Sequence, residues 1–373
     1  MTLLSNLKIL DFSTLLPGPF ATLLMADLGA EVIHVEKPSN NTITQELDSY
    51  LNRSKKSLAL DLKKSESIEI VKELIKEYDI IIEQFRPGVM ERLGLGYEEL
   101  KKINPRLIYC SLTGFGQTGP LRNRPGHDIN YLSIAGVSSH SGTQNGGPAN
   151  LGIQVADIAG GSLHSVIGIL SAVIYRERTG EGQLIDISMT DCSFTLNALS
   201  APLFLNRGIN PESEKSLLNG GTFYGYYETS DGRYFSVGSL EPKFRKALCE
   251  AIGREDLIEI SLSNKPEHIS TFKQVVREAF LQKTFEEWQD IFNEFEACAE
   301  PVLTFAEACE HPHLVDRGMI VDVPQLNGGT EKQMACPIKS SIFSPEYRHA
   351  GLHSGASNEE ILEKLEGILP SNK

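Results

Sequence analysis

The chain has 373 residues, of which 40% are hydrophobic and 23% are charged, with a formal net charge of −14. This length predicts one large domain plus a smaller one, and the composition excludes a disordered or fibrous protein. The negative charge disfavours nucleic acid and anionic membrane surfaces as partners, so an anionic ligand would need a local basic patch.

The first half of the chain alternates short apolar runs with segments of helical periodicity, which is typical of a parallel sheet with crossover helices. The expected elements are a strand at 8–12, a turn at 17–19, a helix at 20–28 closed by Gly29, strands at 31–35 and 57–62, a helical stripe at 68–78, strands at 80–82 and 107–112, a helix at 157–175 and a strand at 184–189. These βαβ units predict a large, doubly wound, Rossmann-like α/β domain.

The character of the sequence changes near residue 219. The runs 223–229 and 233–237 flank Ser230-Asp231-Gly232, a hairpin signal absent from the first half. An aromatic stripe at helical spacing over 285–295 predicts core packing. We therefore expect a large domain over 1–218, a small α+β domain over 219–317, and a C-terminal segment, 318–373, that returns to the large domain.

The N-terminus and the cysteines indicate the compartment. The chain enters an apolar strand almost at once, without the basic start and cleavable apolar run of a signal peptide and without a membrane-length segment, so we expect a cytoplasmic protein with no membrane partner. Six widely scattered cysteines show no metal-ligand spacing. They predict buried free thiols and no metal site.

The run Gly114–Gly119 matches the G-x-G-x-x-G pattern and follows an expected strand. A dinucleotide fingerprint should open a helix, but Pro120 follows here, and residues 122–126 have a loop composition. The pattern therefore favours a glycine-rich active-site loop over a nicotinamide site.

Three titratable residues stand beside turns or helix starts. His127 follows Pro125-Gly126 and is a candidate acid–base group, although a solvated or capping histidine is the ordinary interpretation. Asp157 begins the long small-residue helix, where a carboxylate commonly serves as the N-cap. Glu241, between a strand and a helix, has the ordinary interpretation of a helix-start charge.

Motifs along nearly the whole chain resemble the family III CoA-transferases, also called the CaiB/BaiF family. They include Leu10-Asp11-Phe12-Ser13, residues 16–22, 27–33 and 36–38, Asn52-Arg53-Ser54-Lys55, Leu60-Asp61-Leu62-Lys63, Phe85-Arg86-Pro87-Gly88, Gly114-Phe115-Gly116, Pro301-Val302 and Arg317-Gly318-Met319. Residues 126–131 and 240–244 are similar to the α-methylacyl-CoA racemase branch.

The resemblance implies roles for the three titratable residues. His127 and Asp157 would be acid–base residues on opposite faces of the carbon next to a CoA thioester, with Glu241 as the partner of His127. In the transferases, the aspartate at the position of Asp157 is a nucleophile. The family also implies an interlocked homodimer, in which Glu241 of one chain reaches His127 of the other.

The resemblance also implies a CoA site in the large domain. Its residues would be Leu16, Lys37, Leu60, Lys63, Gln84, Phe85, Arg86, Arg92 and Leu93. Arg53 is a further basic candidate for the phosphates, and surface solvation is the ordinary interpretation of each basic residue. Gln84 and Lys37 replace an Asn and an Arg that are common in the family, and Lys cannot reproduce the bidentate fork of Arg.

Racemisation needs one group to remove a proton and another to return it on the opposite face, with the charge held on an enolate oxygen. The thioester itself makes the proton labile, so no prosthetic group is required, and CoA enters as part of the substrate. The sequence thus predicts a 2-methylacyl-CoA racemase. The alternatives are CoA transfer between carboxylic acids and a catalytically silent CoA-binding protein.

Overall fold

The computed structural model describes residues 2–38 and 45–366. The chain forms two compact units: the first contains Met1–Ala135, Leu151–Leu196 and Pro312–Lys373, and the second contains Gly136–Asn150 and Asn197–His311. Residues 136–150 and 197–218 thus fall in the second unit, whereas the sequence analysis placed them in the large domain. They hold each other through hydrogen bonds such as the one from the Gln144 amide to Glu214, at 2.9 Å.

The first unit is built on a six-stranded parallel sheet with the order β3-β2-β1-β4-β5-β8. Its strands are β1 (Lys8–Phe12), β2 (Glu31–Glu36), β3 (Lys56–Ala59), β4 (Ile80–Glu83), β5 (Ile108–Thr113) and β8 (Gln183–Ser188). This is the doubly wound order that the alternating elements predicted, so the fold class is confirmed. The central strands are mostly apolar and are buried on both faces, because helices cover both.

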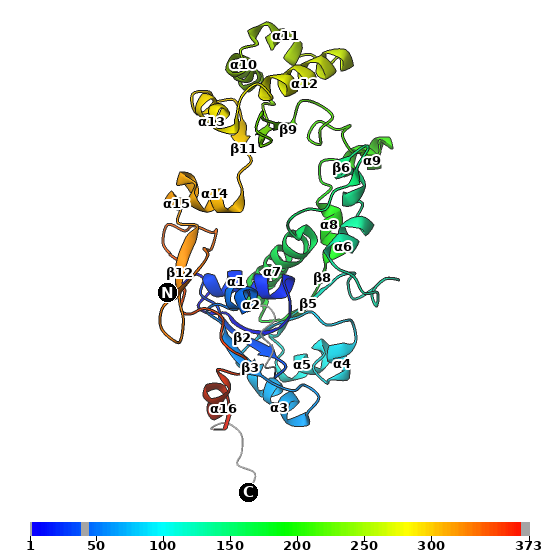
Figure 1. The fold of residues 1–373 in the computed structure, drawn as a ribbon. Helices are drawn as coiled ribbons and strands as arrows, with labels where there is room; N and C mark the ends of the chain where they lie inside the picture. Colours follow the sequence, from blue (N-terminus) through cyan, green and yellow to red (C-terminus); the bar gives the residue numbers. More distant parts are fainter. Residues whose placement is uncertain (1, 39–44, 367–373) are drawn as a thin grey trace. The chain divides into compact units, whose positions relative to one another are not determined.

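The helices of the first unit lie in two layers (Figure 1). α3 (Ser65–Leu74), α4 (Val89–Arg92), α5 (Tyr97–Ile103) and α16 (Asn358–Glu366) pack on one face, around Leu10, Ile33 and Ile81. α1 (Pro17–Asp27) and α7 (His164–Thr179) cover the other. The remaining helices are α2 (Gln45–Leu51), α6 (Asp128–Ile134), α8 (Met189–Thr195) and α15 (Pro312–Asp316), together with the hairpin β12 (Ile320–Pro324) and β13 (Thr330–Met334).

Three sequence-based boundaries in the first unit are wrong. The predicted turn at 17–19 is the first turn of α1, because proline is compatible with the opening positions of a helix, where its missing N–H costs nothing. The helical stripe predicted at 68–78 is α3, which starts at Ser65 and ends at Leu74. The strand predicted at 57–62 ends at Ala59, and the chain then turns, with the Lys64 amide bonded to the Asp61 carbonyl at 2.9 Å.

The C-terminal segment covers the open edge of β3. The Asn358 side chain accepts a hydrogen bond from the Ala59 amide at 2.8 Å and donates one to the Ala59 carbonyl at 3.2 Å. The Ser357 amide bonds to the Ser57 carbonyl at 3.0 Å. A side-chain amide thus takes the place of a neighbouring strand at an edge that would otherwise expose unpaired backbone groups.

The helix predicted at 157–175 is a composite. It starts as a π-helix, η2 (Ala156–Leu163), and continues as α7. Its glycines let it pack closely against α8 and α1, because an added Cβ at Gly160 would lie 3.2 Å from the Met189 carbonyl oxygen and one at Gly161 would lie 3.2 Å from Pro17 Cβ. π-Helical segments are rare and occur frequently at functional sites.

The second unit is an α+β fold with the three-stranded sheet β11-β10-β9. The predicted hairpin is confirmed as β9 (Gly225–Glu228) and β10 (Tyr234–Val237), joined to β11 (Ala299–Pro301). The aromatic stripe lies in α13 (Phe285–Asn293), where Phe285, Trp288 and Phe292 are buried as core residues, as predicted. The other elements are α9 (Ala201–Arg207), α10 (Pro242–Ala251), α11 (Ile258–Ser261), α12 (Pro266–Phe280), α14 (Phe305–Glu310), β6 (Gly142–Thr143), β7 (Gly147–Pro148) and the 3₁₀ turns Val137–His140 and Glu255–Leu257.

Candidate active site

The carboxyl ends of the parallel strands lie along one edge of the sheet, and most of the predicted site residues follow them. Leu16 follows β1, Lys37 follows β2, Leu60 follows β3, and Gln84 follows β4. β1 and β4 are neighbours from which the chain winds outward in opposite directions. This is the topological switch point, the usual ligand-binding crevice of an open α/β sheet.

The loop after β1 is held in place by a buried network. The Asp11 carboxylate, which is not exposed, accepts a hydrogen bond from the Ser13 amide at 2.9 Å. The Lys55 ammonium, also buried, lies 3.3 Å from Asp11 and donates to the Pro19 carbonyl at 3.0 Å. Across the switch point, the Gly18 amide donates to Gln84 Oε1 at 3.1 Å. Buried charges are tolerated when they are paired and hydrogen-bonded in this way.

The glycine-rich segment after β5 is a loop, as predicted, and His127 lies at its end. Gly116 and Gly119 have φ values of 81° and 83°, in the left-handed region that favours glycine. His127 is exposed and occupies the N-cap position of α6, where its amide donates to the Asn130 side chain at 3.0 Å. The imidazole is therefore presented at the surface of the first unit by a fixed backbone.

Tyr131 shapes the loop beside His127. Its ring packs edge-on against Phe115, with 5.2 Å between ring centroids. An added Cβ at Gly114 would lie 2.3 Å from this ring, and one at Gly126 would lie 2.7 Å from it. Both positions therefore require glycine because of close approach, which gives a structural reason for the glycines of this segment.

Asp157 lies in the first turn of η2 and does not cap it, so the expectation of an N-cap aspartate is wrong. Its backbone amide donates instead to the Asp128 carboxylate at 3.0 Å. The pKa of the half-buried Asp157 carboxyl is raised to about 6, first by burial and then by the charge of Asp128, while the charge of His127 lowers it. Burial disfavours the charged form of a carboxyl, and a nearby positive charge favours it.

In the first unit, Asp128 links the segments of His127 and Asp157, because it directly follows His127 and accepts a hydrogen bond from the Asp157 amide. Sequence reasoning did not single out Asp128, although it stands in the motif next to His127. It is 8% exposed, and a buried aspartate that directly follows a loop histidine requires a specific partner. Its partner is the amide of Asp157, 29 residues further along the chain.

Glu241 lies in the second unit. It occupies the N-cap position of α10, is exposed, and makes no side-chain capping hydrogen bond. The helix-start position that the sequence indicated is therefore confirmed, and the carboxylate is free of a capping role.

The basic candidates separate into two groups. Lys37, Lys63, Arg86 and Arg92 are exposed in loops and in α4, after the ends of their strands. Arg53 is only 1% exposed and makes a bidentate ion pair with Asp27, at 2.9 and 2.5 Å. Arg53 also stacks against Tyr50 and Tyr347. The prediction of a phosphate contact by Arg53 is therefore wrong, because its donors are used inside the fold.

The apolar candidates are positioned by the core. Leu60 is 6% exposed, and Phe85 and Leu93 pack against the same hydrophobic cluster. The Phe85 amide is fixed by the Glu83 carboxylate at 2.8 Å. Leu16 is half-buried at the N-cap position of α1. Rigid apolar surfaces thus lie beside exposed basic groups at the carboxyl edge of the sheet.

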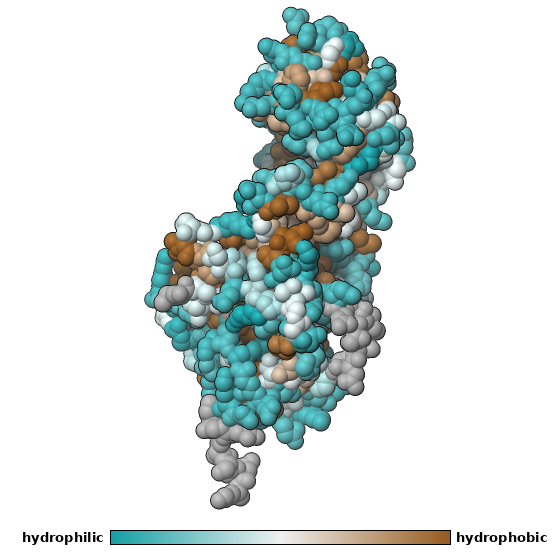
Figure 2. Space-filling view, turned by 60° about the vertical axis from the view of Figure 1, so that its left-hand side comes forward, coloured by the Kyte–Doolittle hydropathy of each residue, from teal (hydrophilic) through white to brown (hydrophobic). Residues whose placement is uncertain are grey.

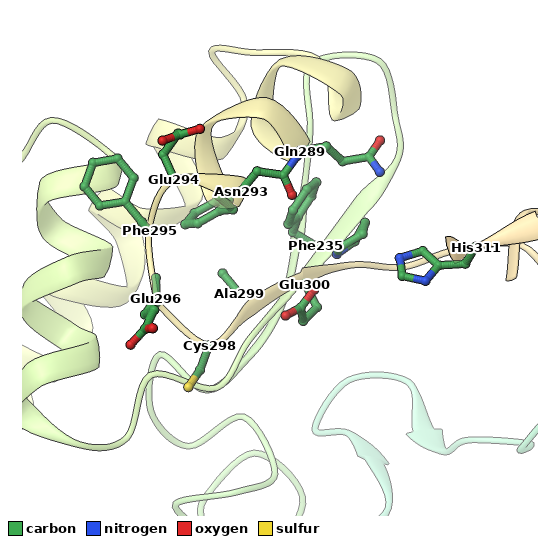
Figure 3. Close-up of a pocket in the computed structure, with 13 residues that line it drawn as sticks. Phe235, Gln289, Asn293, Glu294, Phe295, Glu296, Cys298, Ala299, Glu300 and His311 are labelled. Atoms are coloured by element: carbon green, nitrogen blue, oxygen red, sulfur yellow. The ribbon is translucent and has the colours of Figure 1, made fainter. Parts of the chain in front are cut away.

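A separate cavity of about 540 Å³ lies in the second unit (Figure 3). Its lining includes the carboxylates of Glu294, Glu296 and Glu300, and among its lining residues there is neither Lys nor Arg. A polyphosphate would be repelled by this lining. Its lining residues belong to the second unit, whereas His127 and Asp157 belong to the first, so the cavity is described separately from the candidate active site.

The arrangement in the first unit suits proton transfer. The Asp157 carboxyl, whose pKa is raised to about 6, can remove or return a proton at working pH, and histidine is the side chain most often used in acid–base catalysis. Among residues 2–38 and 45–366, no group of three His, Cys, Asp or Glu side chains is placed to hold a metal ion.

Comparisons with known proteins identify the family. Residues 4–353 match the model of CoA-transferase family III. The chain is 39% identical over 374 residues to alpha-methylacyl-CoA racemase of Homo sapiens, covering 97% of this chain and 93% of that protein. It is 31% identical over 361 residues to acetyl-CoA:oxalate CoA-transferase of Acetobacter aceti, covering 93% and 91%. A crystal structure of a CAIB/BAIF family protein from Brucella suis superposes with a TM-score of 0.85 at 30% identity, covering 98% and 99%. The resemblance that the motifs predicted is confirmed, and the chain belongs to CoA-transferase family III.

Proposed function

We propose that this protein is a racemase of 2-methylacyl-CoA thioesters. The observation that supports the proposal is the hydrogen bond from the Asp157 amide to Asp128, the neighbour of His127, together with an Asp157 pKa raised to about 6. In one direction, the Asp157 carboxylate removes the proton from the 2-carbon, the electron pair moves onto the thioester oxygen as an enolate, and protonated His127 returns a proton to the opposite face. In the other direction the two residues exchange roles.

The similarity to the human racemase supports this chemistry, and the lower identity to the oxalate CoA-transferase keeps CoA transfer as the alternative. In the alternative, the Asp157 carboxylate would attack the thioester carbonyl, release CoA thiolate and form a mixed anhydride. A carboxyl whose pKa lies near the working pH can both remove and return a proton, as racemisation requires, whereas nucleophilic attack requires no such pKa. The raised pKa of Asp157 therefore suits racemisation.

The CoA moiety is proposed to bind at the switch point. The phosphates would be contacted by four exposed cations, Lys37, Lys63, Arg86 and Arg92. The adenine and pantetheine would be contacted by a second set of residues, apolar except for one side-chain amide: Leu16, Leu60, Gln84, Phe85 and Leu93. Binding energy from this remote part of the substrate positions the reacting carbon.

The active form is proposed to be a homodimer in which Glu241 of the partner subunit orients His127. One observation supports a protein partner. On α7, Ile167 is 60% exposed and Ile174 is 57% exposed, while Ile169 and Val173 pack inward. Other exposed apolar residues of the first unit are Leu163, Tyr175, Leu184 and Phe194. Figure 2 shows apolar side chains at the surface among hydrophilic ones.

A second chain fits this apolar surface better than lipid does. By length and composition, the helical run Ala156–Thr179 could cross a membrane, a property shared by core helices of globular proteins. One face of α7, however, packs against β5 and β8. A helix packed on a sheet cannot be surrounded by lipid, because the sheet would have to enter the bilayer with it.

The proposed dimer should not dissociate on dilution. Interlocked chains separate only with partial unfolding, so sedimentation velocity in the micromolar range should show a single species of twice the chain mass. Replacing Ile167 and Ile174 by Lys should reduce the yield of folded dimer, whereas the same change at exposed Leu326, in the hairpin turn before β13, should not. A wild-type monomer would contradict the proposal.

The pH dependence of proton exchange should follow Asp157. In His127→Ala, Asp157 is the only base, and exchange of the 2-proton with solvent requires its ionised form. The exchange rate should therefore rise with pH through a midpoint set by the pKa of Asp157, which is about 6 in the unmodified enzyme, and level off at higher pH. Because the charge of His127 lowers the pKa of Asp157, its removal should place the midpoint somewhat higher. Initial rates in buffered heavy water measure this, and a rate that falls with pH would contradict the assignment.

A further inference from the structure

Ser162 connects the helix of Asp157 to the loop at the switch point. The side chain is not exposed, and its hydroxyl oxygen lies 2.6 Å from the Pro17 carbonyl oxygen and 3.1 Å from the Asp157 carbonyl oxygen. A hydroxyl has a single proton to donate, so the shorter contact makes Pro17 the main acceptor. The same oxygen therefore touches the backbone of both segments.

The two segments lie in direct contact because the helix has no side chains there. An added Cβ at Gly161 would lie 3.2 Å from Pro17 Cβ and 3.3 Å from Leu112 Cδ1. Ser162 is the next residue, so its short side chain spans the remaining gap. A larger residue would push the helix away from the loop, and a residue without a hydroxyl would leave the Pro17 carbonyl without this donor.

The loop after β1 is held rigidly in place. The Gly18 amide is held by Gln84, and the Pro19 carbonyl is held by buried Lys55. An added Cβ at Gly18 would lie 2.1 Å from Ser13 Cβ, so the backbone of the loop is closely packed as well. The loop is therefore a rigid anchor, and the bond from Ser162 to Pro17 is the contact that holds η2 at a set distance from this loop.

We propose that Ser162 is a positioning residue that sets the distance between the CoA thioester, held by the loop, and the Asp157 carboxyl. This inference rests on the proposed racemase function. Loss of the hydroxyl leaves the first turn of η2 held by the bond from the Asp157 amide to Asp128, while the His127 amide is fixed by Asn130 at the start of α6. A displacement of about 1 Å in a reacting group costs on the order of 100-fold in rate. The effect should fall on the Asp157 step and spare the His127 step.

The test measures deuterium incorporation at the 2-carbon in heavy water, separately from each enantiomer of a 2-methylacyl-CoA. The enantiomer served by Asp157 is the one whose exchange is lost in Asp157→Asn. In Ser162→Ala, exchange from that enantiomer should fall about 10- to 100-fold, and exchange from the other should change less than about 3-fold. The ratio of the two rates is independent of the fraction of folded enzyme. Ser162→Gly, which also lacks the hydroxyl, should give the same ratio.

Ser193 provides a matched control. It is equally buried, lies on α8 beside Gly160, and its hydroxyl has no hydrogen-bond partner among the residues that the structure describes. Ser193→Ala should leave the ratio unchanged. An unchanged ratio in both Ser162 variants, or the same change in Ser193→Ala, would overturn the role of Ser162 alone. Absence of exchange from both enantiomers in the unmodified enzyme would instead overturn the proposed function, and the role of Ser162 with it.

Discussion

His127→Ala and Asp157→Asn should each abolish racemisation of a single-enantiomer 2-methylacyl-CoA, with losses on the order of 10²- to 10⁴-fold. Unmodified enzyme in heavy water should invert the 2-carbon and incorporate deuterium there, because the returning proton comes from a group that exchanges with water. Each variant retains one base, which can remove a proton and return a deuteron on its own face. The two variants should therefore exchange opposite enantiomers without inversion, as chiral analysis and mass spectrometry would show.

The same experiment separates the racemase from the transferase. CoA transfer leaves the 2-carbon unlabelled and requires a second carboxylate, and its acyl intermediate on Asp157 is trapped by hydroxylamine. Asp128→Asn provides a further control: it keeps an acceptor for the Asp157 amide but removes the charge that, after burial, raises the pKa of Asp157. It should retain racemisation. Full racemisation in either His127→Ala or Asp157→Asn would remove that residue from the mechanism.

Arg53→Met should destabilise the first unit by about 3–5 kcal/mol, because it leaves the buried Asp27 carboxylate without its partner. Methionine keeps much of the side-chain volume, so most of the loss comes from the uncompensated charge. Urea unfolding followed by circular dichroism measures the difference. The difference in free energy of unfolding between the parent and Arg53→Met should shrink as the pH is lowered. At low pH the unpaired Asp27 is protonated, and burying a neutral carboxyl costs less than burying a carboxylate.

Two controls isolate the buried charge. Adding Asp27→Asn to Arg53→Met should recover part of the stability, since the unpaired carboxylate is gone. Arg254 makes a bidentate pair with Asp256 of similar geometry, at 2.8 and 2.7 Å, but on the surface. Arg254→Met should change stability little. If Arg53→Met were as stable as the parent, and lost affinity for CoA instead, Arg53 would be a ligand contact after all.

Much of the first unit was predictable from local patterns. The apolar runs that form β1, β2, β4, β5 and β8 are short and bounded by turns, and a strand buried on both faces needs little more than such a run. The hairpin of β9 and β10 follows from its turn residues. His127 and Asp157 were named from motifs that resemble a family. The C-terminal end of β3 was predicted wrongly because single polar residues occur in strands as well as in turns. The start of α1 was predicted wrongly because prolines occur in turns as well as in the first turn of a helix.

Only the tertiary structure decided which charged groups are free to act. Arg53 and Lys37 are both basic residues of motifs that resemble the family. Arg53 is buried in an ion pair with Asp27, however, whereas Lys37 is exposed. Asp128 bonds the amide of Asp157 across 29 residues, and Ser162 bonds Pro17 across 145. Sequence patterns report local backbone preference and the burial of faces. Hydrogen bonds between distant segments depend instead on how the chain packs, and packing sets the pKa of Asp157 and the position of its helix.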